Sequence, residues 1–234
     1  MKVRVNSASE GVAVKQQATN AELKPRSTKG RRTRARLIDA GQKVFERDGF
    51  LNARITDIAE QAGVSHGSFY HYFPSKEAIF REIAQEQEVR LLAIDDGHER
   101  FDDPIDGIRW ANQEYLRAYR DAVAIMRVIE EVTRYDTIVS EDRVARWQRF
   151  AGRLEGAIKR LQTTGDADAS IDAWYAANAL GGMVAKFAEM WFIQGENYDF
   201  EQAVEQLTRL WANALGMGDT RAANANLTLD LPSR

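Results

Sequence analysis

The residues best suited to chemistry lie in one short segment, ITDIAEQAGVSHGSFYHYFPSK, at positions 55–76. Hydroxyl, imidazole and phenol side chains occur together at 65–71, with a glycine at 67 and a phenylalanine at 69. Such side chains can hydrogen-bond to base edges and to phosphate oxygens, and a glycine lets a backbone approach a groove. The segment therefore indicates polar recognition of a nucleic acid.

The spacing within this segment predicts two short helices joined by a tight turn. Thr56 is expected to cap the first helix, Gly63 to adopt a left-handed conformation, and Ser65 to cap the second helix. The positions that must pack inward are apolar or small: Ile58, Ala59, Ala62, Val64, Phe69, Tyr72 and Phe73. This pattern is typical of a helix-turn-helix, whose second helix enters the DNA major groove.

Residues 34–83 resemble the tetracycline-repressor (TetR) family of transcription regulators. The first helix reads RARLIDAGQKVFERDGF, and it is followed by ARITDIAEQAGVSHGSFYHYFPSKEAIFREI. Beyond about residue 95 the resemblance is limited to helical character and length. It implies an N-terminal DNA-binding head, a C-terminal domain that binds a small-molecule effector, and a homodimer formed by the last two helices. Repression released by the ligand is the behaviour that this family implies.

The expected contacts to double-stranded DNA divide by chemistry. His66 and Ser68 are predicted to bond base edges, and the basic run before the first helix to contact phosphates or the minor groove. The resemblance implies phosphate contacts at Thr56, Tyr70, His71 and Lys76. The predicted DNA-binding set is Arg31, Arg32, Arg34, Arg54, Thr56, Ser65, His66, Gly67, Ser68, Tyr70, His71 and Lys76, and Arg36 is a further candidate for a phosphate or minor-groove contact.

Charge is distributed unevenly along the 234 residues, whose formal net charge is −3. Residues 1–76 contain 14 Lys and Arg against 7 Asp and Glu, whereas residues 77–234 contain 18 against 28. The basic part holds the DNA motif, as an electrostatic footprint requires. Cysteine is absent, which excludes disulfides and thiolate metal sites, and no secretory signal or membrane span is visible. A cytoplasmic location is expected.

The periodicity of apolar residues predicts an all-α fold of about nine helices. The expected organisation is a disordered basic arm at 1–30, a three-helix helix-turn-helix head at 31–76, a ligand-binding and dimerisation domain at 77–217, and a flexible tail at 218–234. The expected helix ranges include 31–48, 139–162, 170–194 and 200–215. Pro104 is expected in the first turn of a helix.

The C-terminal domain is predicted to hold an apolar or amphipathic ligand, with a weak preference for a lipid-like molecule, because it is rich in Trp, Phe and Met. The candidate ligand contacts are Trp110, Tyr115, Tyr119, Met126, Trp147, Phe150, Trp174, Asn178, Met183, Phe187 and Trp191. Six polar residues interrupt these apolar helices, and one or two of them are candidates to bind a head group: Asn112, Arg127, Glu130, Arg134, Asn178 and Lys186.

Other functions are less consistent with the sequence. An enzyme is not expected, because the sequence contains no nucleophile–base set, phosphate loop or metal-ligand spacing, and no cofactor is predicted. His66 and His71 fall on different helix faces, and the acidic residues around His98 are more typical of a solvated loop than of a metal site. An architectural DNA binder is disfavoured by the acidic 77–234 region.

Overall fold

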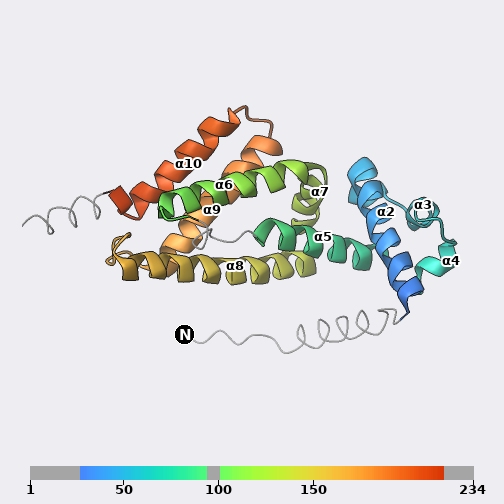
Figure 1. The fold of residues 1–234 in the computed structure, drawn as a ribbon. Helices are drawn as coiled ribbons and strands as arrows, with labels where there is room; N and C mark the ends of the chain where they lie inside the picture. Colours follow the sequence, from blue (N-terminus) through green and yellow to red (C-terminus); the bar gives the residue numbers. More distant parts are fainter. Residues whose placement is uncertain (1–26, 94–100, 219–234) are drawn as a thin grey trace, which may run out of the picture. The chain divides into compact units, whose positions relative to one another are not determined.

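The computed structural model describes residues 27–93 and 101–218, and the prediction of an all-α fold is confirmed for them (Figure 1). The described residues form nine helices: α2 (Thr28–Asn52), α3 (Ile55–Gln61), α4 (His66–Phe69), α5 (Lys76–Leu92), α6 (Pro104–Asp121), α7 (Val123–Thr133), α8 (Thr137–Thr164), α9 (Ala173–Phe192) and α10 (Phe200–Ala214). None of these helices is both long enough and apolar enough to cross a membrane.

The chain divides into two compact units. Among the described residues, the N-terminal unit comprises 27–87 and 124–143, and the C-terminal unit comprises 88–93, 101–123 and 144–218. The predicted domain limits at 31, 77 and 218 remain a prediction, and most of the proposed arm and tail lies outside the described residues.

An aromatic core holds the N-terminal unit together. Phe45 packs edge-on against Phe80 at 5.2 Å between ring centroids, and Phe69 lies 5.9 Å from Phe73. All four rings are almost completely buried, so they fix α2, α4 and α5 around one centre. The first helix begins three residues earlier than expected because Ser27 caps it by accepting a hydrogen bond from the Gly30 amide at 3.0 Å.

The turn chemistry of the helix-turn-helix is largely as predicted. Gly63 has a φ of 64°, and the Ser65 hydroxyl accepts a hydrogen bond from the Ser68 amide at 3.2 Å. The predicted cap at Thr56 is wrong, because α3 already begins at Ile55 and residue 54 takes the cap position without a side-chain bond. The Thr56 hydroxyl instead donates to the neighbouring Asp57 carboxylate.

In the C-terminal unit α6 packs against both α9 and α10. Asp103, Asp172 and Asp199 cap these three helices by accepting hydrogen bonds from first-turn amides. Pro104 stands in the first turn of α6, as predicted. Close packing of α9 on α8 depends on Gly181, where an added Cβ would stand 3.0 Å from a Leu154 methyl carbon.

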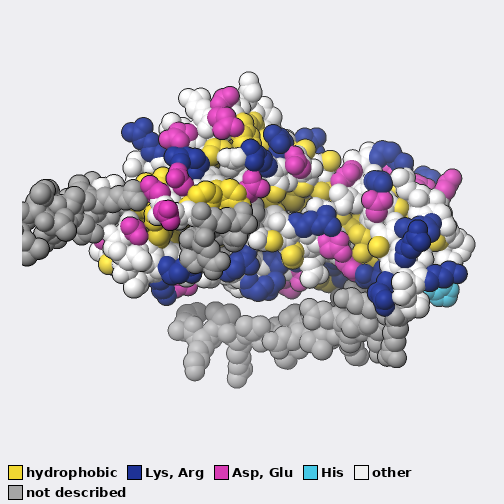
Figure 2. All heavy atoms as spheres, in the orientation of Figure 1, with side chains coloured by type: hydrophobic (Ala, Val, Ile, Leu, Met, Phe, Trp, Pro, Cys, Tyr) yellow, Lys and Arg dark blue, Asp and Glu magenta, His cyan; other side chains and the backbone are white. Residues whose placement is uncertain are grey.

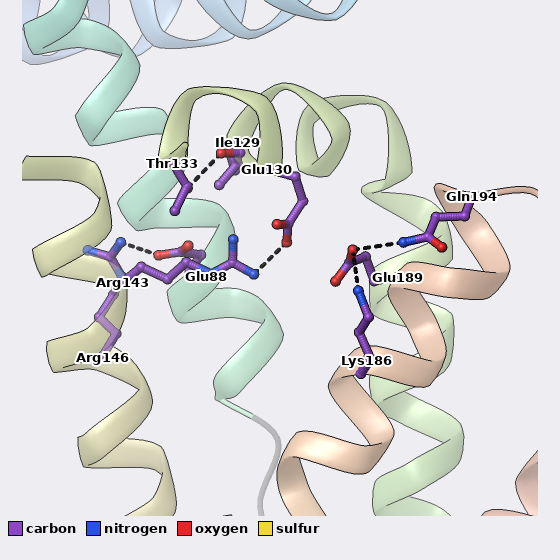
Figure 3. Close-up of polar contacts among 9 residues, drawn as sticks. All are labelled: Glu88, Ile129, Glu130, Thr133, Arg143, Arg146, Lys186, Glu189 and Gln194. Carbon is purple, nitrogen blue, oxygen red and sulfur yellow. Dashed lines mark hydrogen bonds and ion pairs between the residues drawn. The ribbon is translucent and has the colours of Figure 1, made fainter. Parts of the chain in front are cut away.

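Ion pairs connect helices within each unit (Figure 3). Glu130 of α7 accepts a hydrogen bond from Arg143 of α8 at 2.5 Å in the N-terminal unit. In the C-terminal unit Glu88, near the end of α5, pairs with Arg146 of α8, and the two side chains are only 5% and 6% exposed. A buried pair of this kind needs both partners, since either charge alone would be left without water or a counter-ion.

Candidate nucleic-acid interface and ligand cavity

The segment from Ser65 to Phe73 has one buried side and one open side. Phe69 and Phe73 are 0% and 1% exposed and anchor the segment, while Tyr72 is half-buried rather than fully buried. The opposite side presents the exposed residues Ser65, His66, Gly67, Tyr70 and His71. Figure 2 shows histidine at the surface beside α4, where it is open to solvent.

Contacts within the open side order its polar groups. The hydroxyls of Ser65 and Ser68 lie 2.7 Å apart, and the His66 ring packs edge-on against Tyr70 at 5.3 Å. A Cβ added at Gly67 would meet no atom within 4 Å, so the backbone there is bare. We call these exposed residues together with Ser68 the recognition face.

Three of the basic residues predicted to contact DNA are engaged inside the protein: Arg34, Arg36, whose guanidinium donates to the Ala62 carbonyl oxygen, and Lys76. Arg34 donates two hydrogen bonds to the Glu82 carboxylate and lies 4.7 Å from the Phe73 ring centroid, with only 13% of its side chain exposed. This contact neutralises its charge and ties α2 to α5. By contrast, Arg31, Arg32 and Arg54 are exposed.

Lys76 is also held by the protein itself. Its ammonium donates to the carbonyl oxygens of Phe50 at 2.7 Å and of Ala53 at 3.0 Å, and it lies 4.6 Å over the Phe50 ring. These carbonyls belong to the end of α2, where free backbone acceptors favour a cation. Lys76 thus closes the C-terminus of one helix from the first turn of another, and its contact with phosphate remains a prediction.

The C-terminal unit encloses a cavity of about 860 Å³ between α6, α8, α9 and α10. Its walls are mostly apolar, and its volume lies in the range typical of small-molecule sites. Side chains from all four helices reach it, among them Ile108, Tyr115, Phe150, Leu154, Ile158, Leu161, Val184 and Trp211. Of the eleven predicted ligand residues, the structure brings Tyr115 and Phe150 to this cavity.

The other predicted ligand residues lie elsewhere. Phe187 and Trp191 pack edge-on against each other near the end of α9, and both rings contact Tyr198. Trp174 is 41% exposed, and Asn178 bridges the Trp147 indole and the Trp174 carbonyl. Met126 belongs to the N-terminal unit, and the remaining ones, Trp110, Tyr119 and Met183, do not line the cavity. A ligand role for these residues stays a prediction.

Sequence reasoning identified Phe150 on α8 but missed Trp211 and the α8 residues that follow Phe150 along the cavity. The apolar spacing of Leu154, Ile158 and Leu161 on α8 was readable, but it does not distinguish a cavity wall from a filled core. Among the six polar candidates, only Asn112 lines the cavity, and it is 6% exposed. Glu130 and Lys186 pair with Arg143 and Glu189, while Arg127 and Arg134 are exposed.

The loop between α8 and α9 fixes one end of the cavity. Gln162 donates to the carbonyl oxygens of Asp168 and Ile171, and the Asp168 amide donates to Leu215 at 2.9 Å. Hydrogen bonds from Ser170, chiefly from its backbone N–H, lower the pKa of the Asp168 carboxyl below its usual range. The loop is therefore tied to both α8 and the end of α10.

Within the described part of the chain, no group of three or more His, Cys, Asp and Glu could hold a metal ion. The acidic residues nearest to His98 lie largely outside that part.

Comparison with known proteins agrees with the helix-turn-helix geometry. Residues 37–83 match the family described as bacterial regulatory proteins, tetR family. Over these residues the chain is similar to the TetR family. Its relative UidR, an HTH-type transcriptional regulator from Escherichia coli K12, is 34% identical over 85 residues, which are 36% of this chain and 40% of UidR. The chain thus matches less than half the length of this relative.

Two solved structures show the TetR-family fold over most of the chain. A putative TetR-family regulator from Mesorhizobium loti MAFF303099 has a TM-score of 0.67 at 18% identity, with 81% of this chain and 97% of that chain covered. FadR from Bacillus subtilis, solved in complex with stearoyl-CoA, has a TM-score of 0.64 at 16% identity, with 76% and 97% covered.

Proposed function

We propose that this protein is a TetR-family transcriptional repressor that binds a pseudo-palindromic operator as a homodimer. The observation that supports this most directly is the recognition face, which stands on the buried rings of Phe69 and Phe73. A rigid aromatic base with an open polar flank suits a helix that reads the major groove. The protein would work in the cytoplasm, where its operator is accessible.

The proposed DNA contacts follow from exposure. His66 and Ser68 would bond base edges, and Gly67 would let the backbone approach the groove. The phosphate contacts would come from Thr56, Ser65, Tyr70 and His71. Arg31, Arg32 and Arg54 would add electrostatic attraction. Arg34 and Lys76 would contribute by holding α2, α4 and α5 in place, because their charges already have protein partners.

A small apolar or amphipathic ligand would occupy the cavity of the C-terminal unit and release the operator. The volume of about 860 Å³ and the apolar walls support this. FadR, a protein of this fold, was solved in complex with stearoyl-CoA, an amphipathic molecule with a long apolar acyl chain. The ligand would act by binding more tightly to the conformation that does not fit the operator.

Dimerisation through α9 and α10 is supported by exposed apolar side chains. Tyr175 is 76% exposed, Leu210 50% and Trp174 41%, and a Cβ added at Gly182 would meet nothing within 4 Å. Large apolar side chains left exposed on these two helices are available for a partner to cover. A second copy of the chain would form a four-helix contact across a two-fold axis.

Footprinting on the DNA upstream of the chain's own coding region tests the proposal. We expect protection of two half-sites about one helical turn apart, and an affinity about 10³-fold or more above that for random duplex at matched salt. Equal affinity for the protected fragment and random DNA would refute a sequence-specific repressor.

A further inference from the structure

The chain turns from α3 toward α4 at one glycine. Gly63 has a φ of 64°, a left-handed conformation that glycine adopts at little cost. Two backbone hydrogen bonds close the end of α3 around it: the Gly63 amide donates to the Glu60 carbonyl at 2.9 Å, and the Val64 amide donates to the Ala59 carbonyl at 3.0 Å. These two bonds do not use the carbonyl oxygens of Ala62 and Gly63.

Arg36 of α2 binds both of these oxygens. Its Nη2 atom donates to the Ala62 carbonyl oxygen and also to the Gly63 carbonyl oxygen, at 3.4 Å. Ala62 is 3% exposed, so the guanidinium supplies a donor that this nearly buried carbonyl requires. A Cβ added at Gly63 would stand 2.7 Å from the same Nη2 atom, which shows that the guanidinium lies directly against the glycine.

The two carbonyls belong to the peptide groups on either side of Gly63. Because each peptide group is planar, the angle between the two planes is set by the φ and ψ of Gly63 itself. Glycine has the widest range of these angles, so the glycine alone does not fix the turn. A donor that binds both oxygens restricts both angles. Arg36 therefore limits the freedom of the residue at which the chain turns.

The direction of α4 depends on this turn. The helix spans only His66–Phe69, and its cap follows Gly63 by two positions. A helix this short has few hydrogen bonds of its own, so its orientation comes from the preceding turn and from the buried rings of Phe69 and Phe73. A change in the Gly63 angles would move the first residues of the recognition face.

We propose that Arg36 is a positioning residue for DNA recognition: its guanidinium fixes the turn at Gly63 and so sets the orientation of the recognition face, without binding phosphate. This assignment rests on the proposed function, since it concerns how the protein selects an operator. It distinguishes Arg36 from the exposed cations Arg32 and Arg54, which attract any duplex. Loss of Arg36 lowers selectivity, whereas loss of Arg32 lowers attraction to all DNA.

Binding of the full-length protein to the operator identified by footprinting and to random duplex, at several salt concentrations, tests the proposal. Arg36→Met keeps the apolar stem and removes the donors. We expect the ratio of operator affinity to random-duplex affinity to fall about tenfold or more, with random-duplex affinity within about twofold of the wild type. The slope of log affinity against log salt should stay unchanged for random duplex, because no phosphate contact is lost.

Two other variants on α2 provide the comparisons. Arg32→Met should weaken binding to both duplexes alike and reduce the salt slope by about one. Arg47→Met, at a residue that pairs with the adjacent Asp48, should change neither the affinity ratio nor the slope. A salt slope reduced by about one in Arg36→Met would show that Arg36 binds phosphate and would overturn the proposal, as would an unchanged affinity ratio.

A conservative variant and hydrogen exchange separate positioning from a general effect on folding. Arg36→Lys keeps a donor and should restore most of the selectivity that Arg36→Met loses. Amide exchange of residues 62–66 should be about tenfold faster in Arg36→Met than in the wild type, with helix content retained. Unchanged exchange there, or an Arg36→Lys protein as unselective as Arg36→Met, would contradict the proposal. If Arg36→Met does not fold, Arg36→Gln, whose side chain is two atoms shorter than arginine, replaces it in each comparison.

Failure of this assignment differs from failure of the proposed function. A wild-type protein with no operator preference refutes the proposed function before any variant is made, and amide exchange still reports whether Arg36 holds the turn. A wild-type protein that selects an operator, with an Arg36→Met variant that is equally selective, keeps the proposed function and loses only the positioning role.

Discussion

At the scale of one residue, a substitution at Gly67 should affect DNA binding without affecting folding. Its Cα faces open space, so Gly67→Ala should leave the melting temperature unchanged or slightly raised, because alanine favours the helix. The new methyl group would stand between the backbone and the groove. We expect operator affinity to fall about tenfold, the scale of one lost base contact, as measured by fluorescence anisotropy.

The matched control is Gly152→Ala on α8, where an added Cβ also meets nothing within 4 Å. It should match Gly67→Ala in thermal stability and keep full operator affinity. If Gly67→Ala binds the operator as tightly as the Gly152→Ala protein, the backbone at 67 does not approach DNA.

Lys76 stabilises the fold by binding carbonyl oxygens at the end of α2. Lys76→Met would leave the α2 carbonyls without their donor while keeping most of the apolar stem. We expect the free energy of unfolding to fall by about 1–3 kcal/mol, the range for a buried polar group that loses its partner. Chemical denaturation monitored by circular dichroism measures this change.

Lys43→Met provides the comparison, because Lys43 pairs only with Asp39 on the exposed side of α2. That change should alter stability by less than about 0.5 kcal/mol. A Lys76→Met protein of unchanged stability that binds every duplex more weakly would instead show that the lysine contacts phosphate.

At the scale of elements, the Glu88–Arg146 pair joins α5 to α8 within the C-terminal unit (Figure 3). Glu88→Leu would leave a guanidinium buried without a carboxylate, at a cost of about 3–5 kcal/mol. The double variant Glu88→Leu with Arg146→Leu removes both charges and should recover most of that loss. Melting temperatures of the two single variants and the double variant measure the coupling.

Glu155→Leu on α8 serves as the comparison, since the Glu155 side chain is 27% exposed and pairs with the exposed Lys159 four residues away, so its removal should cost little stability. Additive losses in the Glu88→Leu/Arg146→Leu protein would mean that the two charges do not depend on each other.

Local sequence rules predict the helices well. They do not predict the roles of side chains whose partners lie far away in the sequence. Gly63, Ser65 and Ser75 act within three or four residues of their own positions, so the turn and the caps were readable from spacing. Arg34 meets Glu82 across 48 residues, and Lys76 meets Phe50 across 26. No spacing rule predicts such long-range pairs. The sequence alone therefore suggests DNA contacts for Arg34 and Lys76, whose charges are paired inside the protein.

The cavity shows the same limit. Aromatic content indicates an apolar site, but Phe187, Phe192 and Phe200 pack around Trp191 instead of lining the cavity. Asn112 was identifiable as a polar residue in an apolar helix, whereas its contact with Thr208 spans 96 residues. The sequence therefore identifies Asn112 as a candidate, but it does not identify the residues that line the cavity around it.

At the scale of the whole molecule, the uneven distribution of charge and the exposed apolar side chains of α9 and α10 point to one arrangement. Positive charge predominates in the 76 residues that contain the recognition face, with 14 Lys and Arg against 7 Asp and Glu. A two-fold dimer would present two such faces to one operator, and simultaneous binding of both half-sites would raise the affinity far above that of one half-site.

Charged substitutions on α9 and α10 test this arrangement. Tyr175→Glu with Leu210→Glu puts like charges at two residues that are 76% and 50% exposed. If a second copy covers them, light scattering after size exclusion should show a monomer, and operator affinity should fall at least about 100-fold because bivalent binding is lost. Val144→Glu, at a residue 54% exposed on α8, should remain dimeric with full affinity. A dimer that persists in the Tyr175/Leu210 double variant would place the contact on another surface.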